Sequence, residues 1–431
     1  MKKRILSALL VLSLLILPLS MLSGCTAEEG DGSVTTLYVY NWGEYISDGS
    51  EGTVDVNEQF EQWYYDKFHQ RVKVNYSTYS SNESLYAKIS SGSVNYDVIV
   101  PSDYMIERLI EEDLLAKLDY SNIPSAGNIL PEFQNADYDP DLDHNGYNDY
   151  SVPYLYGMIG IIYNTEKVDE ADIGSWDLMW NEKYAGNILQ FNNSRDAFGS
   201  AMYYLGLWDQ INTDNEATWR LALEQLKAQK PILQGYVMDE IYNKMENGSA
   251  LIAAYYAGDY LTMYENNEDL EFYYPKEGTN LYVDAMCVPK ASQNKLIAER
   301  YIDFMLSVDE QYGAPAIANA EYTYYASPNR LVVENEDYYA YMEDIKEGGY
   351  HMMYPDMDPA ATPVKTSSYR NLSGDKLLLL NNLWEELKSD ITVSGGIYAI
   401  CGVILGALIG LSVFLCVRKQ KRKKYTSTLW K

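Results

Sequence analysis

Histidine is scarce in this sequence: only three occur among 431 residues, at positions 69, 144 and 351. The common signatures of catalysis are missing too, because there is no Gly-x-Ser-x-Gly turn, no His-Glu-x-x-His pair and no phosphate-binding Gly-x-x-x-x-Gly-Lys loop. A chain without these motifs and with few general bases is a poor candidate for an enzyme. We therefore expect a protein that binds its ligand without transforming it.

Cysteine is almost as rare, with Cys25, Cys287, Cys401 and Cys416 as the four examples. Cys25 ends an apolar leader, and Cys401 and Cys416 fall in an uncharged run near the other end of the chain. The part between these segments, residues 26–390, is called the body here. Because Cys287 is the one cysteine in the body, no disulfide can form within it.

The body is also poor in basic residues. All 62 Asp and Glu lie within it, whereas ten of the 33 Lys and Arg lie outside, so its formal net charge is about −39. This charge argues against nucleic acid as a partner and favours cations. Solubility alone is the competing explanation of so acidic a composition.

The first 25 residues are typical of a bacterial lipoprotein signal peptide. Lys2, Lys3 and Arg4 precede a long apolar run, and Leu22-Ser23-Gly24 leads into Cys25. We expect Cys25 to be lipidated after cleavage, with residues 26–35 as a Gly/Ser/Glu-rich tether. The alternative is an ordinary secretory signal in which Cys25 is incidental.

The other end of the chain predicts a second membrane anchor. Residues 391–417 contain no charge and are long enough to span a bilayer as one helix. The basic tail that follows, residues 418–431, should then lie in the cytoplasm. Both ends thus place the body on the outer face of a bacterial cell membrane.

The sequence of the body predicts an α/β fold. Strand-like runs such as residues 96–101 alternate with helical patterns such as residues 82–90. Ser81 or Asn82 is a candidate cap for the helix over 82–90. A last helix is expected over 377–387. This alternation predicts a mostly parallel sheet, and a body of this length exceeds one compact core, so two lobes are expected.

Candidate binding residues follow the predicted strands. Trp42, Glu44 and Tyr45 come after the strand that begins at Leu37, and Ser102 comes after the strand over 96–101. Ligands bind beyond the carboxyl ends of such strands, and aromatic faces beside a carboxylate suit an alkylammonium group. An ordinary strand end with surface aromatics is the alternative. Asp284 interrupts an apolar run and needs a partner or a solvated cleft.

One acidic segment has the spacing of a calcium loop. Asp141, Asp143, Asn145 and Asp149 occupy positions 1, 3, 5 and 9, but Val152 stands at position 12, where an EF-hand has Glu. The sequence therefore argues against a full EF-hand. A looser calcium loop and an acidic surface turn both stay open, with the turn favoured, and no other cofactor is expected.

Over residues 36–388 the sequence resembles the spermidine/putrescine-binding proteins of bacterial ABC importers. The shared motifs, in chain order, are Tyr40-Asn41-Trp42-Gly43-Glu44-Tyr45, Tyr76-Ser77-Thr78-Tyr79 with Asn82-Glu83, Tyr96-Asp97-Val98-Ile99-Val100-Pro101-Ser102, Val152-Pro153-Tyr154 with Gly157, Ser175-Trp176, Tyr274-Pro275-Lys276-Glu277-Gly278, Asp284 and Ser327-Pro328-Asn329. No single motif decides the matter, and the ordered set carries the resemblance.

The resemblance implies a two-lobed type II periplasmic-binding-protein fold with the ligand in the cleft between lobes. Lobe 1 would comprise residues 36–156 and 285–330, and lobe 2 residues 157–284 and 331–388. Carried over by motif, the ligand-binding residues would be Trp42, Glu44, Tyr45, Ser102, Tyr104, Asn193, Asp196, Tyr255, Tyr282, Asp284, Tyr325 and Arg370.

Some of these positions depart from the family pattern. Asn193 stands where spermidine binders carry a second acid beside Asp196, and Tyr255 and Tyr282 stand where they carry tryptophans. With one carboxylate fewer, the site is expected to favour a shorter amine such as putrescine over spermidine.

The function implied is capture of putrescine or spermidine outside the cytoplasm and delivery to the permease and ATPase subunits of an ABC importer. Two alternatives stay open: a binding protein for another small cation or amino-compound, and a membrane-anchored sensor using the same lobes. The tail after residue 417 is too short for a kinase domain, which argues against autonomous signalling.

Overall fold

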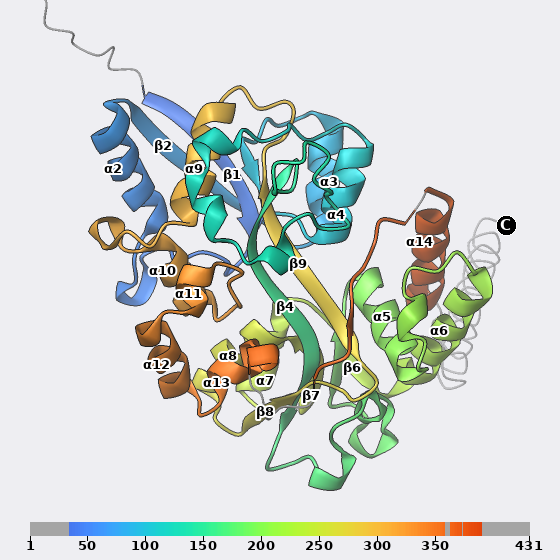
Figure 1. Cartoon of the computed structure of the whole chain (residues 1–431). Helices are drawn as coiled ribbons and strands as arrows, with labels where there is room; N and C mark the ends of the chain where they lie inside the picture. Colours follow the sequence, from blue (N-terminus) through green and yellow to red (C-terminus); the bar gives the residue numbers. More distant parts are fainter. Residues whose placement is uncertain (1–33, 358–362, 373, 390–431) are drawn as a thin grey trace, which may run out of the picture.

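The computed structural model describes residues 34–357, 363–372 and 374–389, which form two α/β lobes joined by two long strands (Figure 1). The strands are β1 (Val34–Trp42), β2 (Arg71–Tyr79), β3 (Val98–Ile99), β4 (Ser151–Asn164), β5 (Ile188–Phe191), β6 (Leu233–Val237), β7 (Ile252–Tyr256), β8 (Leu270–Tyr273), β9 (Thr279–Cys287) and β10 (Thr366–Ser367). The helices are α2 (Val56–Phe68), α3 (Asn82–Ser91), α4 (Asp103–Glu111), α5 (Ser194–Tyr204), α6 (Glu216–Gln229), α7 (Glu240–Glu246), α8 (Ala257–Asn266), α9 (Lys295–Met305), α10 (Pro315–Thr323), α11 (Arg330–Val333), α12 (Glu336–Ile345), α13 (Gly349–Met353) and α14 (Gly374–Ser389).

The strand order is β2-β1-β3-β9-β4-β7-β5-β6. In the first lobe β1 pairs in parallel with β2 and β3, and in the second lobe β5 pairs in parallel with β6 and β7. The prediction of a mostly parallel sheet is therefore correct within each lobe. It is wrong for the connection, because β4 runs antiparallel to β7, β8 and β9.

The strand β4 belongs to both lobes. Its first part pairs with β9, from Ser151 opposite Cys287 to Met158 opposite Leu281, and its second part pairs with β7. Nearly every residue of β4 is buried, which matches its long apolar sequence. Together β4 and β9 carry the chain between the lobes (Figure 1).

The helix predicted over residues 82–90 is confirmed as α3. Ser81 is its cap: the Ser81 hydroxyl accepts a hydrogen bond from the backbone N–H of Ser84, and the Ser84 hydroxyl accepts one from the backbone N–H of Ser81. This reciprocal arrangement satisfies two N–H groups that the helix start would otherwise leave unpaired. It also fixes where α3 begins, next to the ends of β1 and β3.

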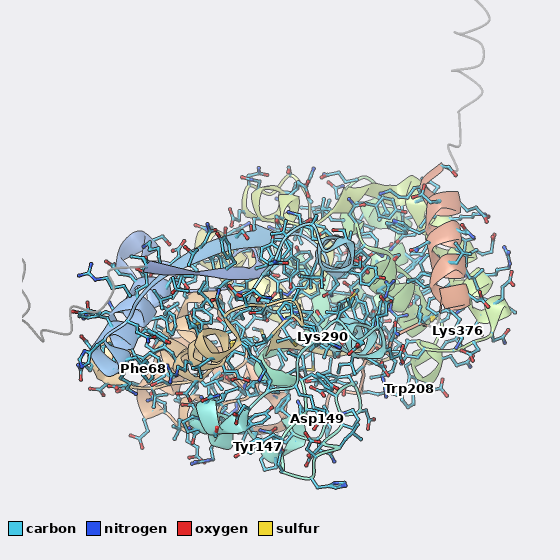
Figure 2. The ribbon with its side chains drawn as sticks, turned by 90° about the horizontal axis from the view of Figure 1, so that it is seen from above. Phe68, Tyr147, Asp149, Trp208, Lys290 and Lys376 are labelled. Carbon is cyan, nitrogen blue, oxygen red and sulfur yellow. The ribbon has the colours of Figure 1, made fainter. Side chains whose placement is uncertain are left out.

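The helix predicted over residues 377–387 is also confirmed, within α14, which packs against α6 at the edge of the second lobe (Figures 1 and 2). Leu380, Leu383 and Leu387 are buried in this contact. Lys376, labelled in Figure 2, forms an ion pair with Asp214. Helix α14 is therefore an integral part of the lobe.

The predicted membrane anchors fall outside the described residues. These include Cys25, the segment 391–417 and the tail 418–431. Within the described ranges, none of the helices has the length and apolar character needed to cross a membrane. The predicted tether ends earlier than expected, because Val34 and Thr35 already belong to β1.

Candidate functional site: an acidic, tyrosine-lined cavity between the lobes

A cavity lies where the loops after β1 and β3 meet the starts of α3, α5, α7 and α8 and the strand β9. The structure places eleven of the twelve candidate ligand-binding residues in its lining: Trp42, Glu44, Tyr45, Ser102, Tyr104, Asn193, Asp196, Tyr255, Tyr282, Asp284 and Tyr325. These residues come from segments up to 283 positions apart in the chain. The strand-end rule accounts for Trp42, Glu44, Tyr45 and Ser102, and the family resemblance supplies the others.

Asp284, on β9, is held by two hydroxyl donors. The Ser102 hydroxyl donates to Oδ1 at 2.6 Å and the Tyr45 hydroxyl donates to Oδ2 at 2.8 Å. Burial raises the pKa of Asp284 to about 6, against the lowering effect of these hydrogen bonds. The carboxyl group is therefore mostly ionised at neutral pH, and each oxygen keeps a lone pair for a further donor.

Asp196 lies in the first turn of α5. Asn193 caps this helix by accepting a hydrogen bond from the Asp196 N–H at 2.8 Å, and its amide donates to the Asp196 carboxylate at 2.6 Å. The Tyr256 hydroxyl donates to the same carboxylate oxygen at 2.7 Å. Burial raises the pKa of Asp196. In the place of a second acid, Asn193 therefore orients the carboxylate of Asp196.

A third buried carboxylate, Asp259, was missed in the sequence. It lies in the first turn of α8, and it accepts hydrogen bonds from the hydroxyl groups of Tyr242 at 2.5 Å and Tyr325 at 2.9 Å. Burial raises the pKa of Asp259 to about 7. Its position three residues beyond the buried strand β7 was a usable signal, because Trp42 and Ser102 were found by the same criterion.

Aromatic rings separate these carboxylates. The Tyr45 and Tyr325 rings meet edge to face with centroids 4.8 Å apart, and the Tyr256 and Tyr282 rings do so at 5.2 Å. Ring faces attract cations and cover methylene groups. A ligand with apolar segments between cationic groups would therefore find both kinds of partner here.

The cavity lining carries far more negative than positive side chains. Its acids are Glu44, Glu83, Asp103, Asp196, Asp239, Asp259 and Asp284, and Arg195 is the one basic residue among the described residues that line it. Asp103 is mostly protonated and neutral at pH 7, because burial raises its pKa to about 8. The remaining excess of carboxylates favours a cationic ligand.

Several buried polar atoms of the lining have no hydrogen-bond partner among the described residues. They are Trp42 Nε1, Arg195 Nε and Nη1, Asn280 Oδ1, Tyr282 Oη and Tyr369 Oη. A buried polar group without a partner is costly, so such atoms are normally satisfied by water or a ligand. Six of the eleven such atoms found in the described residues lie in this lining, which favours a binding site here.

The prediction for Arg370 is corrected by the structure. Its guanidinium group forms a bidentate ion pair with Glu107 on α4, at 3.0 and 2.5 Å, and Arg370 does not line the cavity. Its neighbour Tyr369 does so instead, with its ring against the buried Arg195. Among the described residues 363–372, the two-residue strand β10 is the one regular element.

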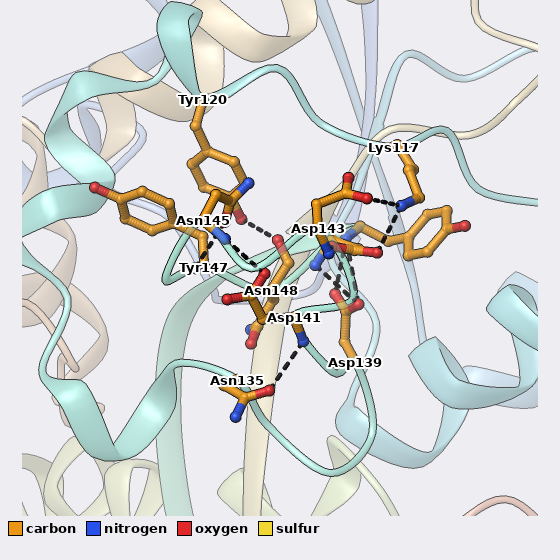
Figure 3. Close-up of polar contacts among 11 residues, drawn as sticks. Lys117, Tyr120, Asn135, Asp139, Asp141, Asp143, Asn145, Tyr147 and Asn148 are labelled. Atoms are coloured by element: carbon orange, nitrogen blue, oxygen red, sulfur yellow. Dashed lines mark hydrogen bonds and ion pairs between the residues drawn. The ribbon is translucent and has the colours of Figure 1, made fainter.

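The candidate calcium residues lie on the surface loop shown in Figure 3, and Tyr147 and Asp149 of the same loop are labelled in Figure 2. Lys117 Nζ donates to both Asp143 and Asp149 at 2.7 Å, and Asp141 accepts from the backbone N–H groups of Asn145 and Gly146. In the described part of the chain, no three His, Cys, Asp or Glu residues are arranged to hold a metal ion. Lys117 thus bridges Asp143 and Asp149 across this acidic loop, and calcium binding by the loop stays a prediction.

Two lobes bridged by paired strands, with an acidic cavity between them, are typical of a solute-binding protein. Residues 56–343 match the family described as bacterial extracellular solute-binding protein, and the chain belongs to that family. It is accordingly an extracytoplasmic binding protein and not an enzyme.

Named relatives agree with the resemblance seen in the sequence, which is confirmed. The chain is 29% identical over 369 residues to the spermidine/putrescine-binding periplasmic protein of Salmonella typhimurium, covering 85% of this chain and 94% of that protein. It is 30% identical over 287 residues to the protein of the same name from Escherichia coli, covering 66% and 76%. It is also similar to the structure of the spermidine/putrescine ABC transporter substrate-binding protein PotD of Streptococcus pneumoniae, with 30% identity, a TM-score of 0.62, and 82% and 98% of the two chains covered.

Proposed function

We propose that this protein captures a polyamine in the cavity between its lobes and delivers it to the permease and ATPase subunits of an ABC importer. One observation carries the proposal: the buried carboxylate of Asp284 is oriented by Ser102 and Tyr45 in a cavity whose walls are aromatic. Relatives that are named as spermidine/putrescine-binding proteins support the same ligand class.

The chemistry of the site suits an alkylammonium ligand. Neutral hydroxyl groups hold Asp196 and Asp284 in place without cancelling their charge, so each carboxylate can still accept a charge-assisted hydrogen bond from an ammonium group. A desolvated carboxylate gains strongly from a counter-ion, and the tyrosine rings provide contact for the methylene chain.

Delivery would use a hinge motion. The lining is drawn from both lobes, and β4 and β9 connect them, so a ligand that touches both sides stabilises a closed form. The closed form would present a surface to the permease that the open form lacks.

For the location of the body, we propose a lipid at Cys25 and a membrane helix over residues 391–417, with the basic tail in the cytoplasm. The support is the sequence at the two ends. Such anchors would keep the binding protein near its importer and raise its effective concentration there.

Calorimetry of the full chain in a non-ionic detergent tests the proposal, with putrescine, spermidine and spermine as titrants. Asp284→Asn should weaken binding by about 100-fold, because a buried charged hydrogen bond is lost. Asp209→Asn, at an exposed position outside the cavity lining, is the matched control and should bind like the unaltered chain. Absence of heat with all three polyamines would contradict the proposal.

A further inference from the structure

Helix α14 ends beside the part of the second lobe that borders the cavity. Lys388, in its last turn, donates a hydrogen bond to Asn192 Oδ1 at 2.8 Å, and its ammonium group lies 4.2 Å from the centre of the Tyr236 ring. Asn192 directly precedes Asn193, which lines the cavity. Tyr236 comes two residues before Met238, which also lines it. The last turn of α14 therefore contacts both chain segments that form this border.

Further contacts fix the same end of α14 (Figure 2, where Lys376 marks its other end). Lys230, directly after α6, donates to the carbonyl oxygens of Leu387 at 2.5 Å and Lys388 at 3.3 Å. The last carbonyls of a helix have no partner within it, so this lysine satisfies them. The Trp384 and Tyr236 rings meet edge to face with centroids 5.6 Å apart. The position of the helix end relative to the cavity is thus set by side chain and backbone together.

The cavity opens on this side of the second lobe. Among the described residues that line it, the exposed ones are Gly43, Glu44 and Ser80 of the first lobe and Asp239 of the second. These four residues are called the mouth here. Asp239 comes three residues after Tyr236, so the mouth lies on the side where α14 ends.

Very little chain separates the end of α14 from the predicted membrane span. The helix ends at Ser389, and the uncharged run begins at residue 391. Two residues reach about 7 Å at most. If the run crosses a bilayer, the last turn of α14 must therefore lie at the layer of lipid headgroups.

We propose, resting on the C-terminal membrane anchor of the proposed function, that the end of α14 with Asn192 and Tyr236 docks on the lipid headgroups and turns the mouth of the cavity toward the bilayer. The anchor then does more than keep the protein near its importer. It orients the body, so that a ligand leaves the cavity on the side where the permease lies.

The side chains at this end suit a headgroup layer. Lys227, Lys230 and Lys388 surround the last turn of α14, and Lys227 pairs with Glu386 at 2.6 Å. A body with a net charge of about −39 is repelled by lipid phosphates, and these lysines reduce the repulsion locally. Trp384 and Tyr236 are half-buried, and such aromatic residues are enriched at membrane interfaces.

The N-terminal anchor can reach the membrane in the same orientation. Strand β1 leads toward the mouth, so its first residue, Val34, lies at the far edge of the first lobe, roughly 30 Å away for a strand of nine residues. Val34 is nine positions after Cys25, and nine residues span about 30 Å when extended. A lipid at Cys25 is therefore compatible with a mouth that faces the bilayer.

The first test measures which edge of the second lobe faces the membrane. Asp239→Cys places a thiol at the mouth, and Ser249→Cys places one before β7, at the opposite edge of the parallel strands; both positions are exposed. Cys287 is buried, and Cys401 and Cys416 are replaced by serine. The full-length chains are reconstituted in vesicles of phosphatidylcholine and phosphatidylglycerol and labelled from outside with an impermeant donor dye, and the chain without an added cysteine gives the background.

Energy transfer to an acceptor dye on the lipid headgroups gives the result. Transfer from position 239 should be roughly twofold or more stronger than from position 249, because the length of β7 alone separates the two edges by about 17 Å. These vesicles hold no importer, so a preferred orientation comes from lipid and not from a partner protein. Equal transfer, or stronger transfer from position 249, would overturn the proposal.

The second test releases the body from the span. A Gly/Ser linker of about 16 residues has a mean end-to-end distance of roughly 20–24 Å. Inserted between Ser389 and Asp390, it should bring the ratio of transfer from positions 239 and 249 to about one, and putrescine binding in detergent should not change. The same linker between Lys424 and Tyr425 is the control and should leave the ratio as it was. A ratio that survives the first insertion would overturn the proposal.

The possible failures are distinguishable. If a protease outside the vesicles removes a tag placed after Lys431, the run does not cross the bilayer and the proposed anchor itself fails. If the tag is protected and both edges transfer equally, the anchor holds and the orientation is wrong. Polyamine capture is measured separately by calorimetry. A melting curve checks each variant, and Ser80→Cys, at the mouth on the first lobe, replaces Asp239→Cys if that variant does not fold.

Discussion

At the scale of single residues, the site depends on carboxyl groups whose pKa is raised by burial. The pKa of Asp284 is raised to about 6 and that of Asp259 to about 7, in both cases mainly by burial. Hydroxyl donors oppose this effect without removing it. A cation that binds must find these groups ionised, so ligand binding and proton release are coupled.

The stability of the ligand-free fold and the affinity for the ligand should therefore change with pH in opposite directions. A carboxyl group with a raised folded-state pKa stabilises the fold below its unfolded pKa, and this contribution is lost as the pH rises through 6 to 7. Putrescine affinity should instead fall about tenfold or more from pH 8 to pH 5, as Asp284 and Asp259 take up protons. Calorimetry in two buffers of different ionisation enthalpy measures the protons released. An affinity that does not change over this range would contradict the assignment.

At the scale of elements, the cavity is assembled from helix starts. Asp103, Asp196 and Asp259 lie in the first turns of α4, α5 and α8. The helix dipole and the free N–H groups of a first turn favour negative charge, which offsets part of the cost of burying these acids. Caps such as Asn193 then decide how the carboxylates point.

Two asparagine caps allow the structural role of Asn193 as a helix cap to be separated from its role in ligand binding. Asn193 caps α5 inside the cavity, and Asn215 caps α6 by accepting a hydrogen bond from the Ala217 N–H outside the cavity lining. Asn193→Ala and Asn215→Ala should each destabilise the protein by about 1 kcal/mol in denaturant unfolding. Only Asn193→Ala should also weaken polyamine binding, since it releases Asp196. Equal affinities of the two variants would show that Asn193 is no more than a cap.

At the scale of the whole molecule, the segment between β10 and α14 joins distant parts of the chain. Arg370 and Asn371 in this segment both bind Glu107 on α4, and the Arg370 contact is bidentate. The segment also places Tyr369 in the cavity. We infer that these contacts help to hold the cavity closed around a ligand.

Glu107→Gln removes the charge of this contact and touches no cavity residue. We expect the complex to release putrescine about fivefold faster, the effect of roughly 1 kcal/mol from a partly exposed ion pair, with little change in the association rate. Stopped-flow tryptophan fluorescence measures both rates. Glu112→Gln, which breaks the nearby surface pair with Arg108, is the control. An unchanged release rate would show that the ion pair between Glu107 and Arg370 does not stabilise the closed cavity.

The sequence by itself determined the class of fold, the family and most of the cavity. Strand-ending motifs are local, and the carboxyl ends of parallel strands share one edge of a sheet, so Trp42 and Ser102 could be brought together without coordinates. Asp284 lies within β9 and was assigned to the site through the family resemblance. The helix start at Ser81 followed from the same kind of local signal, because a capping side chain bonds to backbone only three residues away.

Only the tertiary structure decided which side chains face one another across the cavity. Asp259 gains its role from Tyr242 and Tyr325, and no spacing in the sequence shows that these three residues meet. Arg370, which the sequence predicts in the cavity, pairs instead with the distant Glu107, and Lys117 lies beside the acidic loop without any local signal for it. Such contacts depend on how remote segments pack, which local periodicity and turn chemistry do not encode.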